Sequence, residues 1–232
     1  MPARNEIPLD RALRETLGSL SEEALVQEIC EVRTTPMVPE IQAYLATDQH
    51  RFWRQGEEAM AAYPFGMPFW GIPWAGGLAL ARWVLDFPEV VRGKVIWCFA
   101  GGAGIEAIAA LKAGAAKVIV NDIDSIACTA ARLNAALNGH EIEICVEDVI
   151  GEPLLGVDLF FAGDFCYDES LSQRTFCWLD RINAQGIEIY IGDPGRVFLA
   201  RDHLMPVWRG SAEIGHDYDD ADVRRASVFR YA

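Results

Sequence analysis

From Val95 onward, apolar runs of strand length alternate with segments of helical periodicity. Continuous apolar runs predict strands that are buried on both faces, as in a parallel sheet. We expect strands at 95–99, 117–121, 142–146, 157–162 and 187–191, and helices that end at Ala113 or span 125–138 and 169–184. A further helical piece should run through Trp208, before alternating segments at 211–218 and 224–231 form a hairpin. About seven strands of this kind predict a doubly wound α/β sheet with a terminal antiparallel hairpin.

The first part of the chain has a different texture. Residues 1–62 read as helical, with Ser19 or Ser21 as a cap and Pro39 in the first turn of a helix, and nothing there alternates like a strand. Residues 63–77 (YPFGMPFWGIPWAGG) form a loop rich in proline and aromatic residues, followed by a short helix at 78–86. We therefore expect an N-terminal helical extension with this loop at 1–90 and one compact domain at 91–232.

Composition and charge narrow the class of protein. The chain has 232 residues, of which 51% are hydrophobic and 23% charged, and this suits a globular protein with a sizeable core. No apolar run reaches the roughly 18 residues that span a bilayer, and acidic residues near the start argue against a signal peptide, so we expect a cytoplasmic protein without a membrane partner. The six cysteines lie singly and read as reduced, buried thiols, and the four histidines show no metal spacing. A net charge of −14 argues against nucleic acid and favours a basic partner, although an acidic surface also serves solubility alone.

A glycine-rich turn follows the strand at 95–99. Gly101, Gly102 and Gly104 lead into a helix, which is the outline of a nucleotide-cofactor site. Asp122 ends the next strand, where a carboxylate can accept both ribose hydroxyls of an adenosine, and Ile123 belongs to the same predicted site. Asp148 follows the third strand and can accept the exocyclic amine of an adenine. The loop also satisfies the GxGxxA form of the dinucleotide fingerprint, so a nicotinamide-dependent oxidoreductase remains an alternative. The long segment before the loop and the terminal hairpin argue against that alternative.

Five stretches together carry a more specific signal. They are PFWGIPWAGGLALARWVLD (68–86), the glycine loop, NDID (121–124), GDFCYDE (163–169) and IGDPGR (191–196). With them the chain resembles the seven-strand, S-adenosylmethionine-dependent methyltransferases, and more narrowly the lysine methyltransferases that modify the beta subunit of electron-transfer flavoprotein.

This resemblance implies roles for particular residues. Trp74 would border the cofactor, the glycines would pass under its methionine portion, and Asp122 would hold its ribose. Asp164 and Tyr167, with Asp168 or Glu169, would line a channel for the acceptor lysine, and we assign Asp164, Tyr167 and Glu169 to catalysis and Asp164 also to the cofactor site. The resemblance also shows two departures: Cys98 replaces the acid that ordinarily helps to anchor the cofactor's amino group, and Ala100 replaces the first glycine of the motif.

Methyl transfer to an amine is an in-line displacement that needs a desolvated, correctly aimed nitrogen and no covalent nucleophile. Asp164 follows a buried strand, where it can attract a lysine ammonium or instead cap the next helix. Phe165 and Tyr167 can exclude water or belong to the core, and Trp74 can cover the cofactor or fill a hydrophobic gap.

Several alternatives remain open for the function. The acceptor can be the flavoprotein subunit, a ribosomal protein or a small amine, and the chain can also be a non-catalytic binding protein that keeps the fold. An acidic turn at 216–222 (HDYDDAD) can be a solvated hairpin tip or can hold a basic protein substrate.

Overall fold

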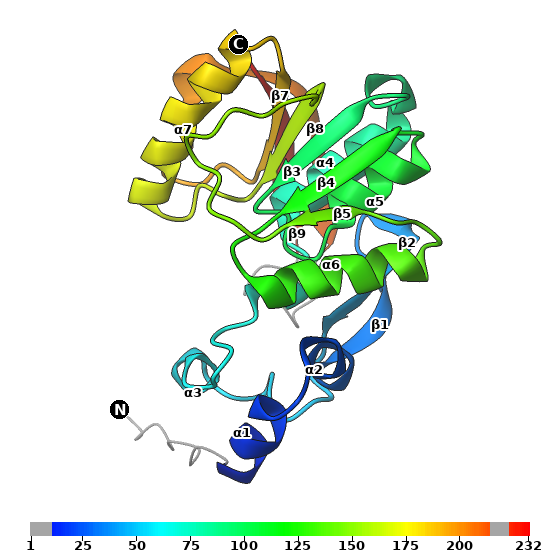
Figure 1. Cartoon of the computed structure of the whole chain (residues 1–232), viewed down its shortest axis with the longest axis vertical. Coiled ribbons are helices and arrows are strands. Elements are labelled where there is room, and N and C mark those ends of the chain that lie inside the picture. The colour runs from blue at the N-terminus through cyan, green and yellow to red at the C-terminus, as the bar shows by residue number, and fades with distance from the viewer. Residues whose placement is uncertain (1–10, 214–222) are drawn as a thin grey trace.

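A seven-stranded sheet forms the centre of the computed structural model, which describes residues 11–213 and 223–232 (Figure 1). Its order is β5-β4-β3-β6-β7-β9-β8. The first five strands in this order are parallel, and the pairs β7–β9 and β8–β9 are antiparallel. The strands are β3 (Val95–Phe99), β4 (Lys117–Asn121), β5 (Glu143–Cys145), β6 (Leu159–Gly163), β7 (Glu188–Asp193), β8 (Leu204–Glu213) and β9 (Val223–Tyr231). The predicted doubly wound sheet with its terminal hairpin is confirmed.

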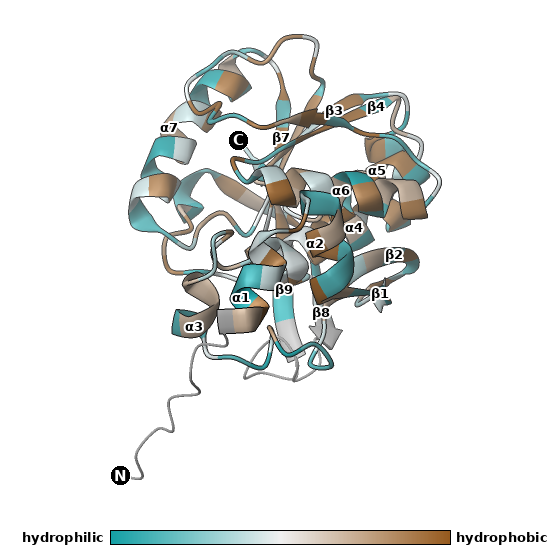
Figure 2. Ribbon diagram, turned by 60° about the horizontal axis from the view of Figure 1, so that its bottom comes forward, coloured by the Kyte–Doolittle hydropathy of each residue, from teal (hydrophilic) through white to brown (hydrophobic). Residues whose placement is uncertain are grey.

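Helices cover both faces of this sheet. On one face, side chains of alternate strand residues such as Ile96, Cys98 and Phe161 pack against α4 (Ala75–Asp86), α5 (Ile105–Lys112) and α6 (Ser125–Leu137). On the other face, Phe160 and Ile189 pack against Trp178 and its neighbours on α7 (Glu169–Ala184). Figure 2 shows the result, with the hydrophobic strands β3 and β4 in the interior and hydrophilic residues along α7. Burial of both faces explains why the strands read as unbroken apolar runs.

The N-terminal part contains the helices α1 (Arg11–Gly18), α2 (Glu22–Ile29) and α3 (Glu57–Ala61), which occupy only part of the segment expected to be helical. Ser21 caps α2 by accepting a hydrogen bond from the backbone N–H of Ala24. A third core cluster joins these helices and Phe52 to Ala127 and Ala130 of α6. The extension is therefore packed against the sheet domain through α6.

The expectation that residues 1–62 contain no strand is wrong. β1 (Cys30–Thr35) and β2 (Val38–Ala46) form an antiparallel two-stranded sheet. Met37 occupies the turn with φ of 61°, and Pro39 lies in β2 instead of a helix. Ile41, Ala43 and Leu45 are buried at every second position, which is the period of a strand. This alternation, together with the β-branched residues of β1, is the signal that the helical interpretation overlooked.

The helix expected through Trp208 is also absent. Before Trp208 the chain forms a short 3-10 turn at Arg201–His203, and β8 begins at Leu204. Two further 3-10 turns lie earlier in the chain, at Phe69–Gly71 and Pro88–Val90. Pro206 is tolerated because β8 is an edge strand whose register shifts between Pro206 and Trp208.

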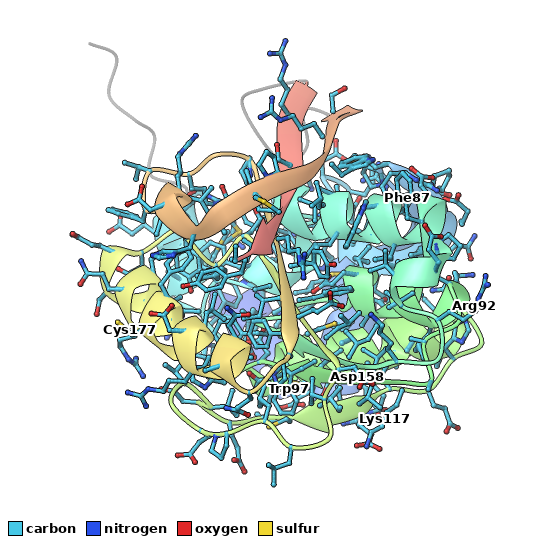
Figure 3. The ribbon with its side chains drawn as sticks, turned by 90° about the horizontal axis from the view of Figure 1, so that it is seen from above. Phe87, Arg92, Trp97, Lys117, Asp158 and Cys177 are labelled. Carbon is cyan, nitrogen blue, oxygen red and sulfur yellow. The ribbon has the colours of Figure 1, made fainter. Side chains whose placement is uncertain are left out.

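The cysteines depart from expectation in part. All six are free, but Cys145 is half-buried and Cys177 is exposed. Cys177 lies on the outer side of α7 (Figure 3), whose buried residues include Trp178 and Leu179. None of the helices in the described ranges is long and apolar enough to cross a membrane.

Candidate functional site

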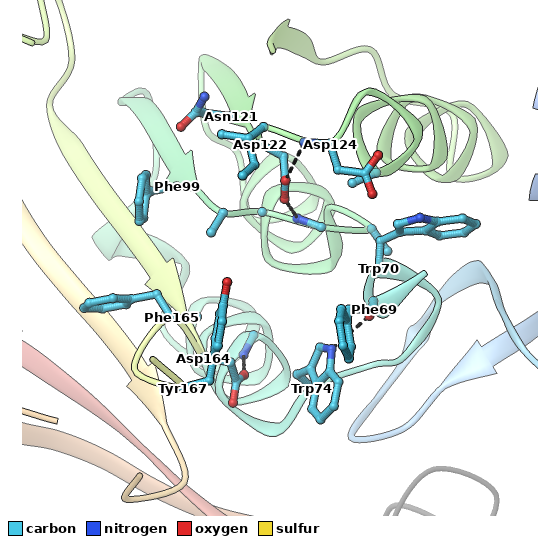
Figure 4. Close-up of a pocket in the computed structure, with 18 of the residues that line it drawn as sticks. Phe69, Trp70, Trp74, Phe99, Asn121, Asp122, Asp124, Asp164, Phe165 and Tyr167 are labelled. Atoms are coloured by element: carbon cyan, nitrogen blue, oxygen red, sulfur yellow. Dashed lines mark hydrogen bonds between the residues drawn. The ribbon is translucent and has the colours of Figure 1, made fainter. Parts of the chain in front are cut away.

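A cavity of about 510 Å³ opens where the parallel strands end (Figure 4). Its walls come from the aromatic loop before α4, from the glycine loop after β3 and from the segments that follow β4, β5, β6 and β7. Of the predicted site residues, the lining includes Trp74, Gly101, Gly102, Asp122, Ile123, Asp148, Asp164 and Tyr167. The carboxyl edge of a doubly wound sheet is where such folds bind ligands.

The glycine loop is held by its own backbone hydrogen bonds. The N–H of Gly101 donates to the carbonyl of Asn121 on β4 at 3.0 Å, and the N–H of Gly104 donates to the carbonyl of Gly101 at 2.8 Å. Gly102 has φ of 49° and faces the cavity. Gly104, with φ of 74°, does not line the cavity; a Cβ there would lie 3.0 Å from the Cβ of Ala131, so it permits close packing of α5 against α6.

Ala100 stands where the first glycine was expected and adopts φ of 49°. This left-handed conformation favours glycine, so the loop keeps the same backbone shape at some conformational cost.

Asp122 is fixed at the end of β4 by two backbone donors. Its Oδ2 accepts from the N–H of Gly102 at 3.0 Å and its Oδ1 from the N–H of Asp124 at 3.0 Å. Burial raises the pKa of this carboxyl, while these hydrogen bonds act in the opposite direction. Each oxygen retains acceptor capacity, which suits paired hydroxyl groups. Ile123, beside it, is 77% exposed and offers an apolar surface at the cavity.

Asp148 lies at the edge of the cavity and already has partners. Its Oδ2 accepts from Nη2 of Arg174 at 2.9 Å, and its Oδ1 accepts from the N–H of Ile150 at 3.2 Å. The Arg174 guanidinium, through its hydrogen bond, lowers the pKa of this exposed carboxyl. Asn121 supports the same segment, because its side-chain amide donates to the carbonyls of Cys145 and Glu147, both at 2.9 Å. Asp148 is thus an ionised acceptor in a fixed loop.

Asp164 is the most constrained residue of the cavity. It has φ of 58°, which is uncommon for a residue other than glycine. Its Oδ2 accepts from the N–H of Gly76 and, at 3.0 Å, from the N–H of Gly77. Its Oδ1 pairs with Nη2 of Arg196 at 3.1 Å. Asp164 therefore caps α4, a distant helix, whereas Asp168 caps the following helix α7 by accepting from the N–H of Leu171.

The environment of Asp164 sets its charge. Burial raises the pKa of its carboxyl to about 6, although the Arg196 guanidinium and the N–H of Gly77 favour the ionised form. Arg196 is itself oriented by an Asp193 turn, in which Oδ1 of Asp193 accepts from the N–H groups of Gly195 and Arg196. Asp164 thus remains mostly ionised at neutral pH, in a nearly water-free position.

Glycines allow α4 to approach the strand ends closely enough for these contacts. A Cβ at Gly76 would overlap with the carbonyl oxygen of Gly192 on β7, and a Cβ at Gly163 would lie 2.8 Å from the nitrogen of Gly77. The double glycine that follows Trp74 therefore positions both the helix and the carboxylate that caps it.

Aromatic side chains surround the entrance (Figure 4). The indole N–H of Trp74 donates to the carbonyl of Phe69 at 2.9 Å, and the Arg196 guanidinium lies 5.6 Å from the centre of the Trp74 ring. Tyr167 is 64% exposed and points its hydroxyl into the cavity, whereas Phe165 is buried against Phe99 and Phe176. Tyr167 therefore faces the ligand space, and Phe165 belongs mainly to the core.

Glu169 lies outside this site. It is the first residue of α7, is exposed, does not line the cavity, and accepts a hydrogen bond from Gln173 at 3.3 Å. Leu171 and Arg174 are the residues of α7 that line the cavity, and Glu169, two positions before Leu171, falls on the opposite side of the helix. The acidic turn at 216–222 lies outside the described residues.

Two residues of the site were missed or undervalued from the sequence. Arg196, to which the sequence analysis gave no role beyond its place in IGDPGR (191–196), contacts both Asp164 and Trp74. Glu106, on the first turn of α5, lines the cavity and is only 5% exposed. Its signal in the sequence is an acidic residue inside a run of small and apolar helical residues, IEAIAA.

The donor and acceptor set fits S-adenosylmethionine. Asp122 and Asp148 offer carboxylates for an adenosine, Ile123 and Ile150 offer apolar surface, and the backbone of Gly101 and Gly102 is open to a ligand. The carboxylates in the lining suit a cationic ligand. An acceptor amine brought to Asp164 would share the same cavity.

Comparisons with known proteins agree with this geometry. Residues 88–160 match the family model of the ribosomal protein L11 methyltransferases (PrmA). The chain is 39% identical over 183 residues to the electron transfer flavoprotein beta subunit lysine methyltransferase of Xenopus laevis, covering 76% of this chain and 73% of that protein. The protein of the same name from Rattus norvegicus is 38% identical over 187 residues, covering 78% and 72%.

Solved structures support the fold. A Pyrococcus horikoshii protein classed with RNA methyltransferases superposes with a TM-score of 0.51 at 17% identity, over 67% of this chain and 83% of that chain. At this level of identity the likeness concerns the arrangement of the sheet and its helices.

Proposed function

Because the chain belongs to the electron transfer flavoprotein beta subunit lysine methyltransferase family, we propose that it methylates lysine side chains of an electron transfer flavoprotein beta subunit. S-adenosylmethionine is the methyl donor of this enzyme class. The observation that carries the proposal beyond family membership is Asp164, a buried and rigidly held carboxylate in the same cavity as the cofactor-binding glycine loop. A carboxylate there attracts an ammonium group to the place where a methyl acceptor is needed.

The cofactor, when bound, supplies a methyl group on a positively charged sulfur. Asp122 and Asp148 hold its adenosine in our proposal, and the rest of the chemistry is positioning. Asp164 orients the acceptor lysine, and Tyr167 with Trp74 restricts water around it. Exclusion of water favours the neutral amine that the displacement requires, because a desolvated ammonium loses its proton more readily.

Arg196 limits how strongly Asp164 holds the acceptor. It neutralises part of the carboxylate charge through Oδ1, while Oδ2 is engaged by the N–H groups of Gly76 and Gly77. An acceptor ammonium therefore meets an oriented but partly compensated acid. This arrangement suits a lysine that approaches as an ammonium, releases its proton to bulk solvent and then attacks the methyl group as a neutral amine.

The similarity to ribosomal protein L11 methyltransferases bears on the donor half of the site. The matched residues 88–160 contain the glycine loop and Asp122 but end before Asp164, Tyr167 and Arg196. This partial match supports a shared donor half, and it makes ribosomal protein L11 the second candidate for the acceptor. The net charge of −14 supports a lysine-bearing protein over nucleic acid, and six free cysteines support a reducing compartment such as the cytoplasm.

The test is intact-mass analysis of purified flavoprotein beta subunit after incubation with the enzyme and S-adenosylmethionine. We expect mass increments of whole methyl groups, and peptide mapping should place them on lysine. Ribosomal protein L11 and free lysine are the alternative acceptors. Unmodified flavoprotein, together with clear binding of S-adenosylhomocysteine, would refute the acceptor and leave the cofactor assignment intact.

Two variants sharpen this test. Asp164→Asn should lower the methylation rate strongly while S-adenosylhomocysteine still binds. The matched control is Glu143→Gln, since Glu143 pairs with Lys117 at 2.7 Å at the start of β5. Lys117 is the first residue of β4, and neither Lys117 nor Glu143 lines the cavity, which opens at the other end of the parallel strands. This control should methylate at the wild-type rate.

A further inference from the structure

Glu106 is a buried carboxylate without a cationic partner among the residues that the structure describes. It lies on the first turn of α5, lines the cavity and is 5% exposed. The pKa of its carboxyl is raised to about 7, mainly by burial; Asp164 and Asp122 act in the same direction, and its own backbone N–H acts in the opposite direction. A buried charge of this kind is costly unless something binds it.

The position of Glu106 within the cavity is defined by its neighbours. A Cβ on Gly77 would lie 3.4 Å from its Oε2, and the same Gly77 donates its N–H to Asp164. The carboxylate thus reaches across from α5 to the first turn of α4. The charged groups that face it are Asp122 and Asp164, and the guanidinium of Arg196 is already paired with Asp164. This end of the cavity therefore has an excess of negative charge.

Cys98 adds a second, independent observation. It is the penultimate residue of β3, at the position where the resemblance implies an acid that helps to anchor the cofactor's amino group. Its side chain is fully buried, and burial raises the pKa of the thiol well above its ordinary value, so it carries no charge. Glu106 is close enough to Cys98 to contribute to that shift. The uncharged Cys98 and the carboxylate of Glu106 are therefore near enough to interact electrostatically.

We propose that Glu106 binds the α-ammonium group of the methionine part of S-adenosylmethionine and so replaces the acid that Cys98 lacks. The acid would then stand on the first turn of α5 and not on β3, and this wall of the cavity would still carry a negative charge. This assignment concerns the cofactor alone and does not depend on which protein accepts the methyl group. A purely structural Glu106 would bind no ligand group, and the two possibilities differ in how affinity depends on the ligand's amine.

The experiment compares ligands that differ only in the amino-acid part. We would measure binding of S-adenosylhomocysteine, its analogue without the α-amine, and 5′-methylthioadenosine, by calorimetry near pH 8. Glu106→Gln should weaken S-adenosylhomocysteine binding by about 10-fold or more, because a charged hydrogen bond is lost. It should change the affinity for the other two ligands by less than about 2-fold, since neither presents an ammonium group to residue 106.

Asp122→Asn is the matched control, because Asp122 is a partly buried carboxylate of the same cavity. All three ligands contain the ribose, so this variant should weaken all three alike. An equal loss for all three ligands in Glu106→Gln, or an unchanged affinity for S-adenosylhomocysteine, would overturn the proposal. Thermal unfolding of each variant shows that the binding data come from folded protein.

Discussion

The replacement of Glu106 by glutamine should make the ligand-free protein more stable at alkaline pH. Glutamine has the same shape but no charge, and the wild-type carboxylate is buried without a cationic partner in the described part of the chain. The folded protein holds the Glu106 proton up to about pH 7, whereas the unfolded chain releases it near 4.5. Wild-type stability is therefore lost as the pH rises from about 4.5 to 7, and the variant avoids that loss.

The size of the effect follows from these two values. At about 1.4 kcal/mol per pH unit, the interval from 4.5 to about 7 corresponds to about 3 kcal/mol. Near pH 8 the variant should gain most of this amount, and near pH 5 it should gain about 1 kcal/mol or less, because the folded wild type is then protonated. For a chain of this length, about 3 kcal/mol corresponds to a rise in Tm of roughly 6–12 °C.

Urea unfolding of both proteins near pH 5 and near pH 8 measures the difference directly. The comparison at each pH cancels the titration of the other carboxylates, apart from those that contact Glu106. Equal stability of the two proteins at both pH values would refute the reasoning, because it would mean that the buried carboxylate carries no cost. A variant that is less stable than the wild type at pH 8 would contradict the predicted direction of the change.

Three further outcomes follow from the geometry of the site. Gly76→Ala should destabilise the protein by about 2 kcal/mol or more, because its Cβ would overlap with the neighbouring strand β7. Gly77→Ala should match or exceed wild-type stability in the same urea titration, because its Cβ would face only the end of the Glu106 side chain. Arg196→Met should raise the pKa of Asp164 above about 6, so the acidic limb of the methylation pH profile should move upward by about one pH unit, and an unmoved limb would contradict a role for Asp164. Asn134→Ala should cost about 3 kcal/mol, because it leaves one buried and one part-buried backbone group without a partner, and a loss below about 1 kcal/mol in urea would contradict this.

The sheet was predictable because burial on both faces leaves a simple pattern. The strands at 95–99 and 117–121 have the expected bounds, and so has the helix at 169–184. The glycine loop and the acidic residues after the strands were found for a related reason: in a parallel sheet, the residue that follows each buried run arrives at the same edge. The apolar pattern of the strands and the topology of the parallel sheet together therefore locate most of the residues that line the cavity.

The remainder depended on contacts that local patterns do not contain. The strand at Val38–Ala46 carries a proline and reads as helix until Ile41, Ala43 and Leu45 are seen to face the same core. Glu106 has no motif of its own, and its burial in the cavity wall is produced only by the folded chain. That Asp164 caps a helix almost ninety residues away is likewise invisible before the fold is known.

Asn134 connects two parts of the molecule that are distant in the sequence. It is fully buried on α6; its Oδ1 accepts from the N–H of Tyr44 in β2 at 2.7 Å, and its Nδ2 donates to the carbonyl of Ala103 in the glycine loop at 3.0 Å. One side-chain amide thus joins the N-terminal hairpin to the glycine loop. For protein engineering, a shortened enzyme or a chimera that begins at the sheet would lose the hairpin partner of Asn134 and the helix that Asp164 caps. The smallest portable catalytic unit therefore starts before Cys30, well upstream of the first strand of the sheet.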